Sequence, residues 1–202
     1  ETPEPAWTAA PRRMVRNKDT EQVHLCLGVE GLRRNDERKY ALFALDVILG
    51  GGMSSRLFQE LREERGLVYS TYSYHVCYQE TGLFAIYAGC SPHNAGQVEE
   101  LVRQEFARVV RDGVTEEELH RAKEQLKGSL MLSLESTASR MSRTAKAELF
   151  DEPYETPDEL VAQVDAVRVQ DVNELAAELL AGPRITLAAI GPWDQQRREG
   201  GA

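Results

Sequence analysis

The sequence contains no long apolar run and no basic tract. None of its apolar stretches approaches the roughly 20 residues that a membrane-spanning helix needs, and residues 1–5 have neither the basic start nor the apolar core of a signal peptide. Its 24 Lys and Arg face 33 Asp and Glu, so the formal charge is −9, the wrong sign for a phosphate-binding surface. The composition therefore predicts a soluble, cytoplasmic protein that binds neither a membrane nor nucleic acid.

Cysteine and histidine are also scarce. The three cysteines form no C-x-x-C pair and each falls in a predicted strand, which is typical of reduced core residues. A zinc peptidase needs two histidines one helical turn apart, a third ligand and a carboxylate that acts as general base. His120 and Glu124 lie one turn apart, but such a pair is typical of a solvated helix face. The four histidines therefore do not predict a catalytic zinc site.

The most informative segment covers residues 50–70, a glycine turn followed by a short charged helix, another glycine and a strand. Gly50, Gly51 and Gly52 allow the preceding helix to end abruptly and a neighbouring segment to approach closely. Ser54 is expected to cap the short helix. The expected apolar stripe of this helix is Leu57, Phe58 and Leu61, and its expected solvent-facing residues are Arg56, Glu60, Glu63 and Glu64.

A tight link at Gly66 separates this helix from the next strand. Arg62 lies in the last helical turn and Tyr69 near the start of the strand, seven residues further on. Glycine at a helix end lets the chain change direction within a short distance. A guanidinium and a phenol can therefore point into one cavity.

Hydrophobic periodicity predicts the other elements. Alternation indicates a strand over 23–29, an antiparallel hairpin from 69–78 and 83–90, and a closing strand over 185–190. Helices are expected at about 36–50, 92–112, 115–135, 137–150, from Thr156 onward, and 171–180, with capping boxes at Thr115/Glu118 and Thr156/Glu159. The order β-α-α-β-β-α-α-α-α-α-β predicts an α+β fold. We expect a two-layer sandwich, in which helices cover one face of a mainly antiparallel sheet.

The ends of the chain differ in composition from its middle. The first eleven residues contain three prolines and begin with glutamate, as in an interdomain linker. We expect a linker over residues 1–20, a single α+β domain over 21–191 and a flexible tail over 192–202. The sequence therefore suggests a piece of a longer protein.

From about residue 11 to residue 191, the chain resembles the second half of the inverzincin metallopeptidases. This insulinase-like family includes pitrilysin, insulin-degrading enzyme and the subunits of mitochondrial processing peptidase, and the resemblance rests on the order and spacing of residues 50–70. It implies that two α/β sandwich halves face each other across a closed substrate chamber. It also implies that an H-x-x-E-H motif in the other half binds zinc, so zinc is expected in a partner half and no metal in this chain.

The resemblance also assigns roles to individual residues. In the family, an arginine and a tyrosine that match Arg62 and Tyr69 reach across the chamber to the peptide near the zinc. Either side chain could stabilise the charge that develops on a peptide carbonyl, or Arg62 could hold that carbonyl in register, and the sequence leaves both roles open. Gly51 and Gly52 are expected to shape the substrate-binding wall, although a helix stop explains them equally well. Residues 83–90 are a candidate for a sheet edge that accepts an extended peptide.

Several readings remain open at this point. The leading hypothesis is the C-terminal half, or a partner subunit, of a zinc-dependent processing endopeptidase that acts on peptides. The alternative is a non-catalytic structural or assembly subunit with the same fold, and either protein could form a homo-oligomer. A third reading is a Cys2His2 zinc cluster, because His24 and Cys26 share their i, i+2 spacing with His75 and Cys77. Two ordinary half-buried strand faces explain that spacing as well.

Overall fold

The computed structural model describes residues 12–182 and 184–193. Within them, five strands form one sheet in the order β1-β5-β2-β4-β3. Strands β1 and β5 are parallel, and every other neighbouring pair is antiparallel. The strands are β1 (Arg13–Arg16), β2 (Val23–Gly31), β3 (Val68–Cys77), β4 (Gly82–Cys90) and β5 (Thr186–Ile190). The predicted α+β class with a mainly antiparallel sheet is confirmed.

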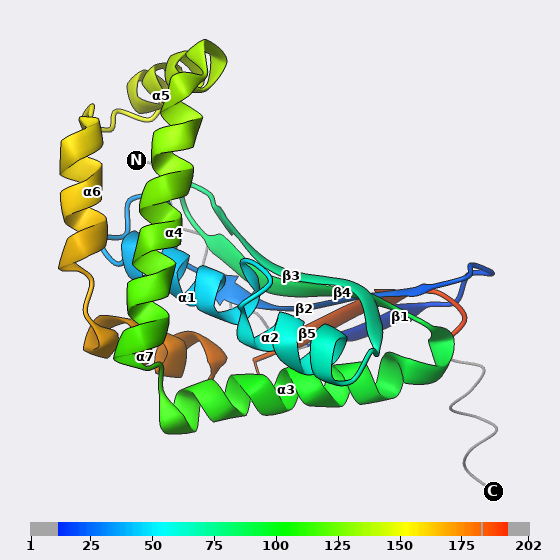
Figure 1. Cartoon of the computed structure of the whole chain (residues 1–202). Helices are drawn as coiled ribbons and strands as arrows, with labels where there is room; N and C mark the ends of the chain where they lie inside the picture. Colours follow the sequence, from blue (N-terminus) through cyan, green and yellow to red (C-terminus); the bar gives the residue numbers. More distant parts are fainter. Residues whose placement is uncertain (1–11, 183, 194–202) are drawn as a thin grey trace, which may run out of the picture.

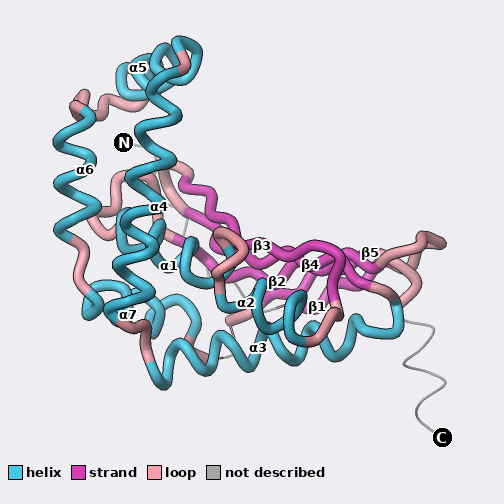
Figure 2. The backbone as a smooth tube through the Cα atoms, viewed as in Figure 1, coloured by secondary structure: helices cyan, strands magenta, loops and turns pink. Residues whose placement is uncertain are grey.

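Helices cover one face of this sheet (Figures 1 and 2). The longer helices in contact with the strands of the sheet are α1 (Lys39–Gly50), α3 (Ala95–Asp112) and α7 (Val169–Leu180), and the short elements between α1 and β3 also contact β3. The other helical elements are α2 (Arg56–Phe58), the π-helical turn η1 (Gln59–Glu64), the 3-10 turn η2 (Pro92–Asn94), α4 (Glu116–Glu135), α5 (Thr137–Leu149) and α6 (Pro157–Ala166). Both α4 and α6 pack against α1, and α5 packs on α4 at the top of Figure 1.

The alternation that predicted β2 is visible in its burial. Val23, Leu25 and Leu27 are fully buried, whereas His24 and Cys26, on the opposite face, are half-buried. Complete burial of one such aliphatic side chain stabilises the fold by about 1.5–3 kcal/mol relative to exposure. The core therefore lies between the sheet and the helices, and the other face of the sheet remains partly accessible.

Two features of the sheet differ from the prediction. The short strand β1 lies in the segment expected to be a linker, and its residues are mostly exposed, so no hydrophobic pattern revealed it. Residues 83–90 are not an edge, because β4 pairs with β2 on one side and with β3 on the other. Among the described residues, the free edges of the sheet are therefore β3 and β1.

Some expectations fall on parts of the chain that are not described. Most of the predicted linker and tail, residues 1–11 and 194–202, lies outside the described residues. Among the described residues, no helix combines the length and the apolar composition required to cross a bilayer.

Candidate substrate-contact site

The helix of the glycine-rich segment begins and ends differently from the prediction. Ser55, not Ser54, occupies the N-cap position of α2, and its hydroxyl donates to the Gly52 carbonyl at 2.6 Å. After one turn the helix widens into the π-helical turn η1. The predicted apolar stripe is confirmed at Leu57 and Leu61, which are fully buried. Turns of the π type are rare and occur frequently at functional sites.

Gly66 closes this turn in a left-handed conformation, with φ of +61°. Its N–H donates to the Arg62 carbonyl at 3.1 Å, and the Leu67 N–H donates to the Leu61 carbonyl at 2.8 Å. Each bond spans one residue more than its counterpart in a glycine-terminated α-helix, because the last turn is wider. In this conformation any residue with a Cβ would lower the free energy of unfolding by roughly 1–2 kcal/mol, so the tight link requires glycine.

Arg62 projects from η1 into solvent. Its guanidinium carbon lies 5.1 Å from the centroid of the Phe58 ring. In the described part of the chain it has no carboxylate partner, whereas the nearby Arg65 pairs with Glu60 at 2.7 Å. The charge of Arg62 is therefore available to a molecule outside this domain.

Tyr69 is the extra residue of a β-bulge. Val68 pairs with Cys90 and Ser70 pairs with Gly89, so Tyr69 has no partner in β4. Bulges turn a side chain out of the regular alternation and are over-represented beside active sites. Tyr69 is 57% exposed, and its hydroxyl forms no hydrogen bond with any other described residue. Like Arg62, it is free to contact a ligand.

The three glycines that precede α2 differ in their surroundings. A Cβ on Gly50 would lie 2.3 Å from the Ser73 backbone nitrogen, so this glycine lets the end of α1 approach β3. A Cβ on Gly51 would lie 2.5 Å from its own helix, at the Val47 Cα. A Cβ on Gly52 would have room. Close packing therefore explains the first two glycines, and a contact between Gly51 or Gly52 and a substrate stays a prediction.

Arg56 is not in solvent, contrary to the expectation. It binds both carboxylate oxygens of Glu118, at 2.6 and 2.8 Å, and also contacts Glu105 at 3.3 Å and the Gly113 carbonyl at 2.9 Å. Burial alone would raise the pKa of Glu118, but hydrogen bonds from Arg56 and from the Thr115 backbone outweigh burial and hold the pKa at about 2. This cluster joins α2 to α3 and α4, and so fixes the segment that carries Arg62.

Strand β3 is attached to α1 through one aspartate. The Ser73 hydroxyl donates to the Asp46 carbonyl at 2.7 Å, and His75 Nδ1 lies 2.7 Å from Asp46 Oδ2. The His75 ring also stacks on Phe43 of α1, with the ring centroids 4.6 Å apart. The strand that begins with Tyr69 is therefore held firmly on the helix layer, although it has a neighbour in the sheet on one side only.

The hypothesis of a Cys2His2 cluster is wrong. Strand β4 lies between β2 and β3, and His75 faces the helices, whereas His24 and Cys26 lie on the opposite face. In the described residues, no three His, Cys, Asp or Glu side chains are grouped closely enough to hold a metal ion. Burial raises the pKa of the Cys26 and Cys77 thiols, which disfavours the thiolate form that binds metals. The residues present therefore do not fit a zinc ion.

Comparison with known proteins identifies the class. Residues 2–126 match the sequence profile of the family described as "Peptidase M16 inactive domain". The chain belongs to the M16 metallopeptidase family. Within that family it corresponds to the inactive C-terminal domain, as the segment 50–70 suggested.

Its relatives are longer than the chain itself. A protein of Bacillus subtilis named as an uncharacterized zinc protease, YmxG, is 48% identical over 180 residues, which are 89% of this chain and 44% of that protein. A similarly named protein of Streptomyces coelicolor, SCO5738, is 45% identical over 184 residues, or 91% of this chain and 40% of that protein. The chain therefore spans less than half the length of these relatives.

Solved structures share the fold. The crystal structure of a peptidase M16 inactive domain from Pseudomonas fluorescens matches with a TM-score of 0.82 and 27% identity, over 90% of this chain and 44% of that one. A protease from Helicobacter pylori matches with a TM-score of 0.81 and 23% identity, over 91% and 44% of the two chains. The arrangement of strands and helices in the described residues is thus that of a solved M16 inactive domain.

Proposed function

We propose that this chain is the half of a zinc-dependent processing endopeptidase that does not itself bind zinc. In this role it closes the substrate chamber and positions the peptide for hydrolysis by a half that contains H-x-x-E-H. The relatives are named zinc proteases, which supports the proposal. Their length supports it as well, because this chain covers only 44% and 40% of the two bacterial proteins. Zinc and the general base are accordingly expected in the partner half.

The observation that carries the proposal is the pair Arg62 and Tyr69. Both side chains are exposed and lack polar partners in the described residues, although other arginines nearby are paired. The π-turn fixes the backbone at Arg62, the bulge fixes it at Tyr69, and Gly66 forms the link between them. Attack of water on a peptide carbonyl builds negative charge on oxygen, and donors fixed in advance stabilise that charge without reorganisation. A guanidinium and a phenol suit this task.

The free edge of β3 supplies a place for the peptide backbone. An extended peptide can add to a sheet edge through main-chain hydrogen bonds, which depend little on its sequence. Because Tyr69 lies at the start of this edge, a peptide bound there would have one carbonyl close to the proposed contact residues. The edge expected in residues 83–90 is thus replaced by β3 in the proposal.

The test requires both halves. The chain is combined with the H-x-x-E-H half of its own protein, and cleavage of a fluorogenic peptide is compared for the wild type, Arg62→Ala and Tyr69→Phe. We expect each variant to lower kcat/KM by about 10²-fold to 10³-fold, the typical loss on removing one oxyanion donor. Arg65→Ala and Tyr72→Phe are the matched controls. Arg65 is paired with Glu60, Tyr72 lies on the open sheet face against Tyr87, and neither control should change the rate more than about twofold.

The kinetic constants separate the remaining roles. A fall in kcat indicates contact in the transition state, and a rise in KM alone indicates binding in register. Unchanged turnover in both variants would refute the assignment of Arg62 and Tyr69. If the combined wild-type halves cleave no peptide even with zinc added, the alternative of a structural or assembly subunit replaces the proposal.

A further inference from the structure

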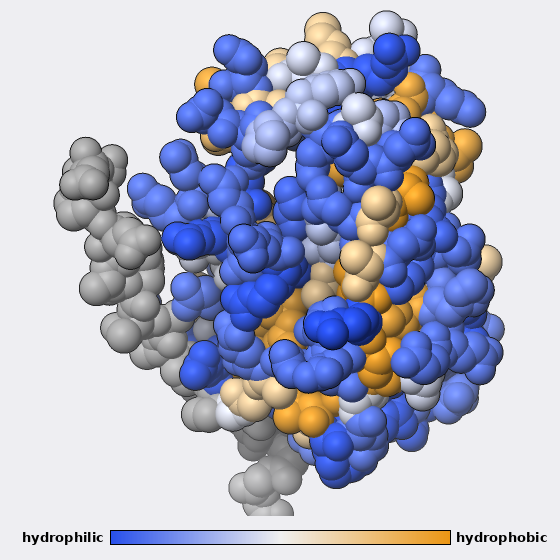
Figure 3. Space-filling model, turned by 90° about the vertical axis from the view of Figure 1, so that its left-hand side faces the viewer, coloured by the Kyte–Doolittle hydropathy of each residue, from blue (hydrophilic) through white to orange (hydrophobic). Residues whose placement is uncertain are grey.

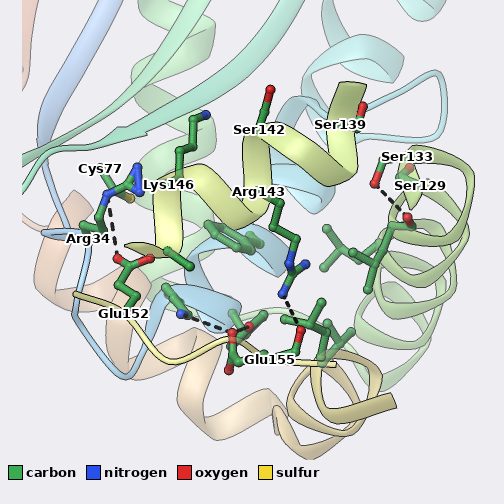
Figure 4. A pocket seen from close by; sticks show the side chains of 18 of the residues that line it. Arg34, Cys77, Ser129, Ser133, Ser139, Ser142, Arg143, Lys146, Glu152 and Glu155 are labelled. Atoms are coloured by element: carbon green, nitrogen blue, oxygen red, sulfur yellow. Dashed lines mark hydrogen bonds and ion pairs between the residues drawn. The ribbon is translucent and has the colours of Figure 1, made fainter. Parts of the chain in front are cut away.

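A cavity of about 990 Å³ lies at the end of β3 that is remote from Tyr69. Figure 4 shows Arg34, Cys77 and Glu152 on one side of it, Ser129 and Ser133 on the other, and Arg143 extending toward Glu155. Its volume lies at the upper end of the range of about 300–1,000 Å³ that is typical of ligand pockets. Apolar side chains from α1, α4 and α6 line it, namely Phe43, Leu126, Leu130, Leu160 and Val164.

The helix above the cavity, α5, contributes four small residues to its lining, together with Arg143 and Lys146. In the described structure, α5 has no buried residue and packs chiefly on α4. The small residues that α5 contributes to the lining are Ala138, Ser139, Ser142 and Ala147. Figure 3 shows the corresponding gap beneath the upper rim of the molecule. A space of this size can accept a peptide side chain.

The apolar part of the lining favours an apolar occupant. Of the charged lining residues, Arg34 is 3.8 Å from Glu152 and Lys39 is 4.0 Å from Glu155, and two further cations are Arg143, which donates to the Glu155 carbonyl at 3.2 Å, and Lys146. Burial and the Glu155 carboxylate raise the pKa of Tyr40, another lining residue, to about 12, as in a poorly solvated environment. The Ser129 hydroxyl has no partner in the described residues and remains available to a peptide group.

The cavity borders the end of the edge strand β3. His75, Val76 and Cys77 are consecutive and all three line it. Val76 is seven residues beyond Tyr69, which corresponds to roughly 23 Å of extended chain.

We infer that this cavity binds a bulky apolar side chain of a peptide that lies along the β3 edge. That side chain belongs to the residue about seven positions from the one opposite Tyr69, a spacing set by the strand rise. The inference rests on the proposed function, because it extends the peptide-binding edge to a specificity site. It assigns this half a preference for unstructured peptides with a large apolar residue at a fixed distance from the cleavage region.

Two peptides of identical composition and about twelve residues test the inference, a length that covers the edge of β3. One carries its single Phe near the end that would reach the cavity, and the other carries it at the centre. Binding to the chain is measured by fluorescence anisotropy. We expect the first peptide to bind about tenfold more tightly or better, as burial of one Phe side chain implies. Equal affinities would overturn the inference.

Neighbouring residues of α4 provide the matched variants. Ser133→Trp places an indole in the cavity and should abolish the preference, whereas Leu132→Trp alters a 68% exposed residue that does not line the cavity and should retain it. In the wild-type chain, benzoylphenylalanine in place of Phe should crosslink to α4 or α5 on irradiation, a result that does not depend on how the variants fold. Crosslinks elsewhere, or a preference that survives Ser133→Trp, would contradict the site.

The outcome is separable from the test of the proposed function. Peptide preference is measured on this chain alone, and cleavage is measured on the combined halves. If Arg62→Ala and Tyr69→Phe leave cleavage unchanged while the preference persists, the proposed function fails and the cavity site stands. If the preference is absent while both variants lose activity, the proposed function stands and the cavity site fails.

Discussion

Glu118→Gln isolates the charge in the cluster around Arg56. Glutamine keeps a side-chain carbonyl at the third position of α4, so the capping box with Thr115 is preserved. The variant loses the negative charge that accepts two hydrogen bonds from Arg56. Glu105 remains beside the guanidinium at 3.3 Å, so Arg56 is not left without a carboxylate.

The size of the effect follows from the burial of the pair. Removing one partner of a buried ion pair costs about 3–5 kcal/mol, and the remaining Glu105 should reduce the cost to about 2–3 kcal/mol at neutral pH. The pKa of Glu118 falls from 4.5 to about 2 on folding. A depressed pKa stabilises the fold above the unfolded value, and that stability is lost as pH falls through the folded value. This pKa shift corresponds to a stability contribution of about 3 kcal/mol. Allowance for solvent screening reduces the contribution to about 2 kcal/mol.

The assay is urea unfolding of wild type and variant at pH 7 and at about pH 2.5. We expect the difference in unfolding free energy to shrink from about 2–3 kcal/mol to less than about 1 kcal/mol, because pH 2.5 lies far below the unfolded pKa of 4.5 and close to the folded pKa of about 2, so most of the stability that the depressed pKa supplies is lost. Glu159→Gln is the matched control: it lies in the other capping box, bonds to Thr156 and has no arginine partner in the described residues. The reasoning would be refuted if the difference in unfolding free energy between wild type and Glu118→Gln were the same at both pH values. It would also be refuted if Glu159→Gln lowered the unfolding free energy by as much as Glu118→Gln.

The remaining predictions concern the segment 50–70 and are checked by the same unfolding measurements. Gly50→Ala should cost about 1–3 kcal/mol, because its methyl group would lie 2.3 Å from the Ser73 nitrogen, whereas Gly52→Ala should change stability by less than about 0.5 kcal/mol; equal effects would contradict the packing argument. Gly66→Ala should cost roughly 1–2 kcal/mol, since its φ is +61°, and a neutral result would mean that the link relaxes. Leu61→Ala should cost about 2–5 kcal/mol and speed amide exchange in η1, and unchanged exchange would show that the buried leucine does not hold the turn.

Local patterns predicted most of the fold. The alternation of β2, the hairpin of β3 and β4, and both capping boxes depend on neighbours within a few residues, and each was confirmed. Arg62 and Tyr69 could be selected from their spacing and from the resemblance. Their exposure, and their lack of polar partners among the described residues, became known only from the structure.

The features that the sequence did not reveal depend on distant segments. Arg56 and Glu118 are 62 residues apart, so nothing near Arg56 indicated its burial. The sequence suggested residues 83–90 as a free edge, but β4 is an inner strand. The order of strands depends on which partners β2 selects, and β2 lies between β5 and β4. The π-turn and the bulge at Tyr69 likewise have no local signal, since each reflects one residue more than the regular geometry accommodates.

The two edges of the sheet differ in how they resist aggregation. Exposed edge strands are normally protected by charged residues, proline or bulges, because unpaired backbone groups recruit further strands. At one edge, β1 carries Arg13 and Arg16, whereas the ten residues of β3 include no lysine, arginine, acidic residue or proline, and the bulge at Tyr69 is the one such device on that strand. The unpaired backbone groups of β3 can bind the β3 strand of a second molecule as well as an extended peptide. The isolated chain should therefore self-associate along β3 as its concentration rises, and each ligand that covers this edge should also keep the protein dispersed.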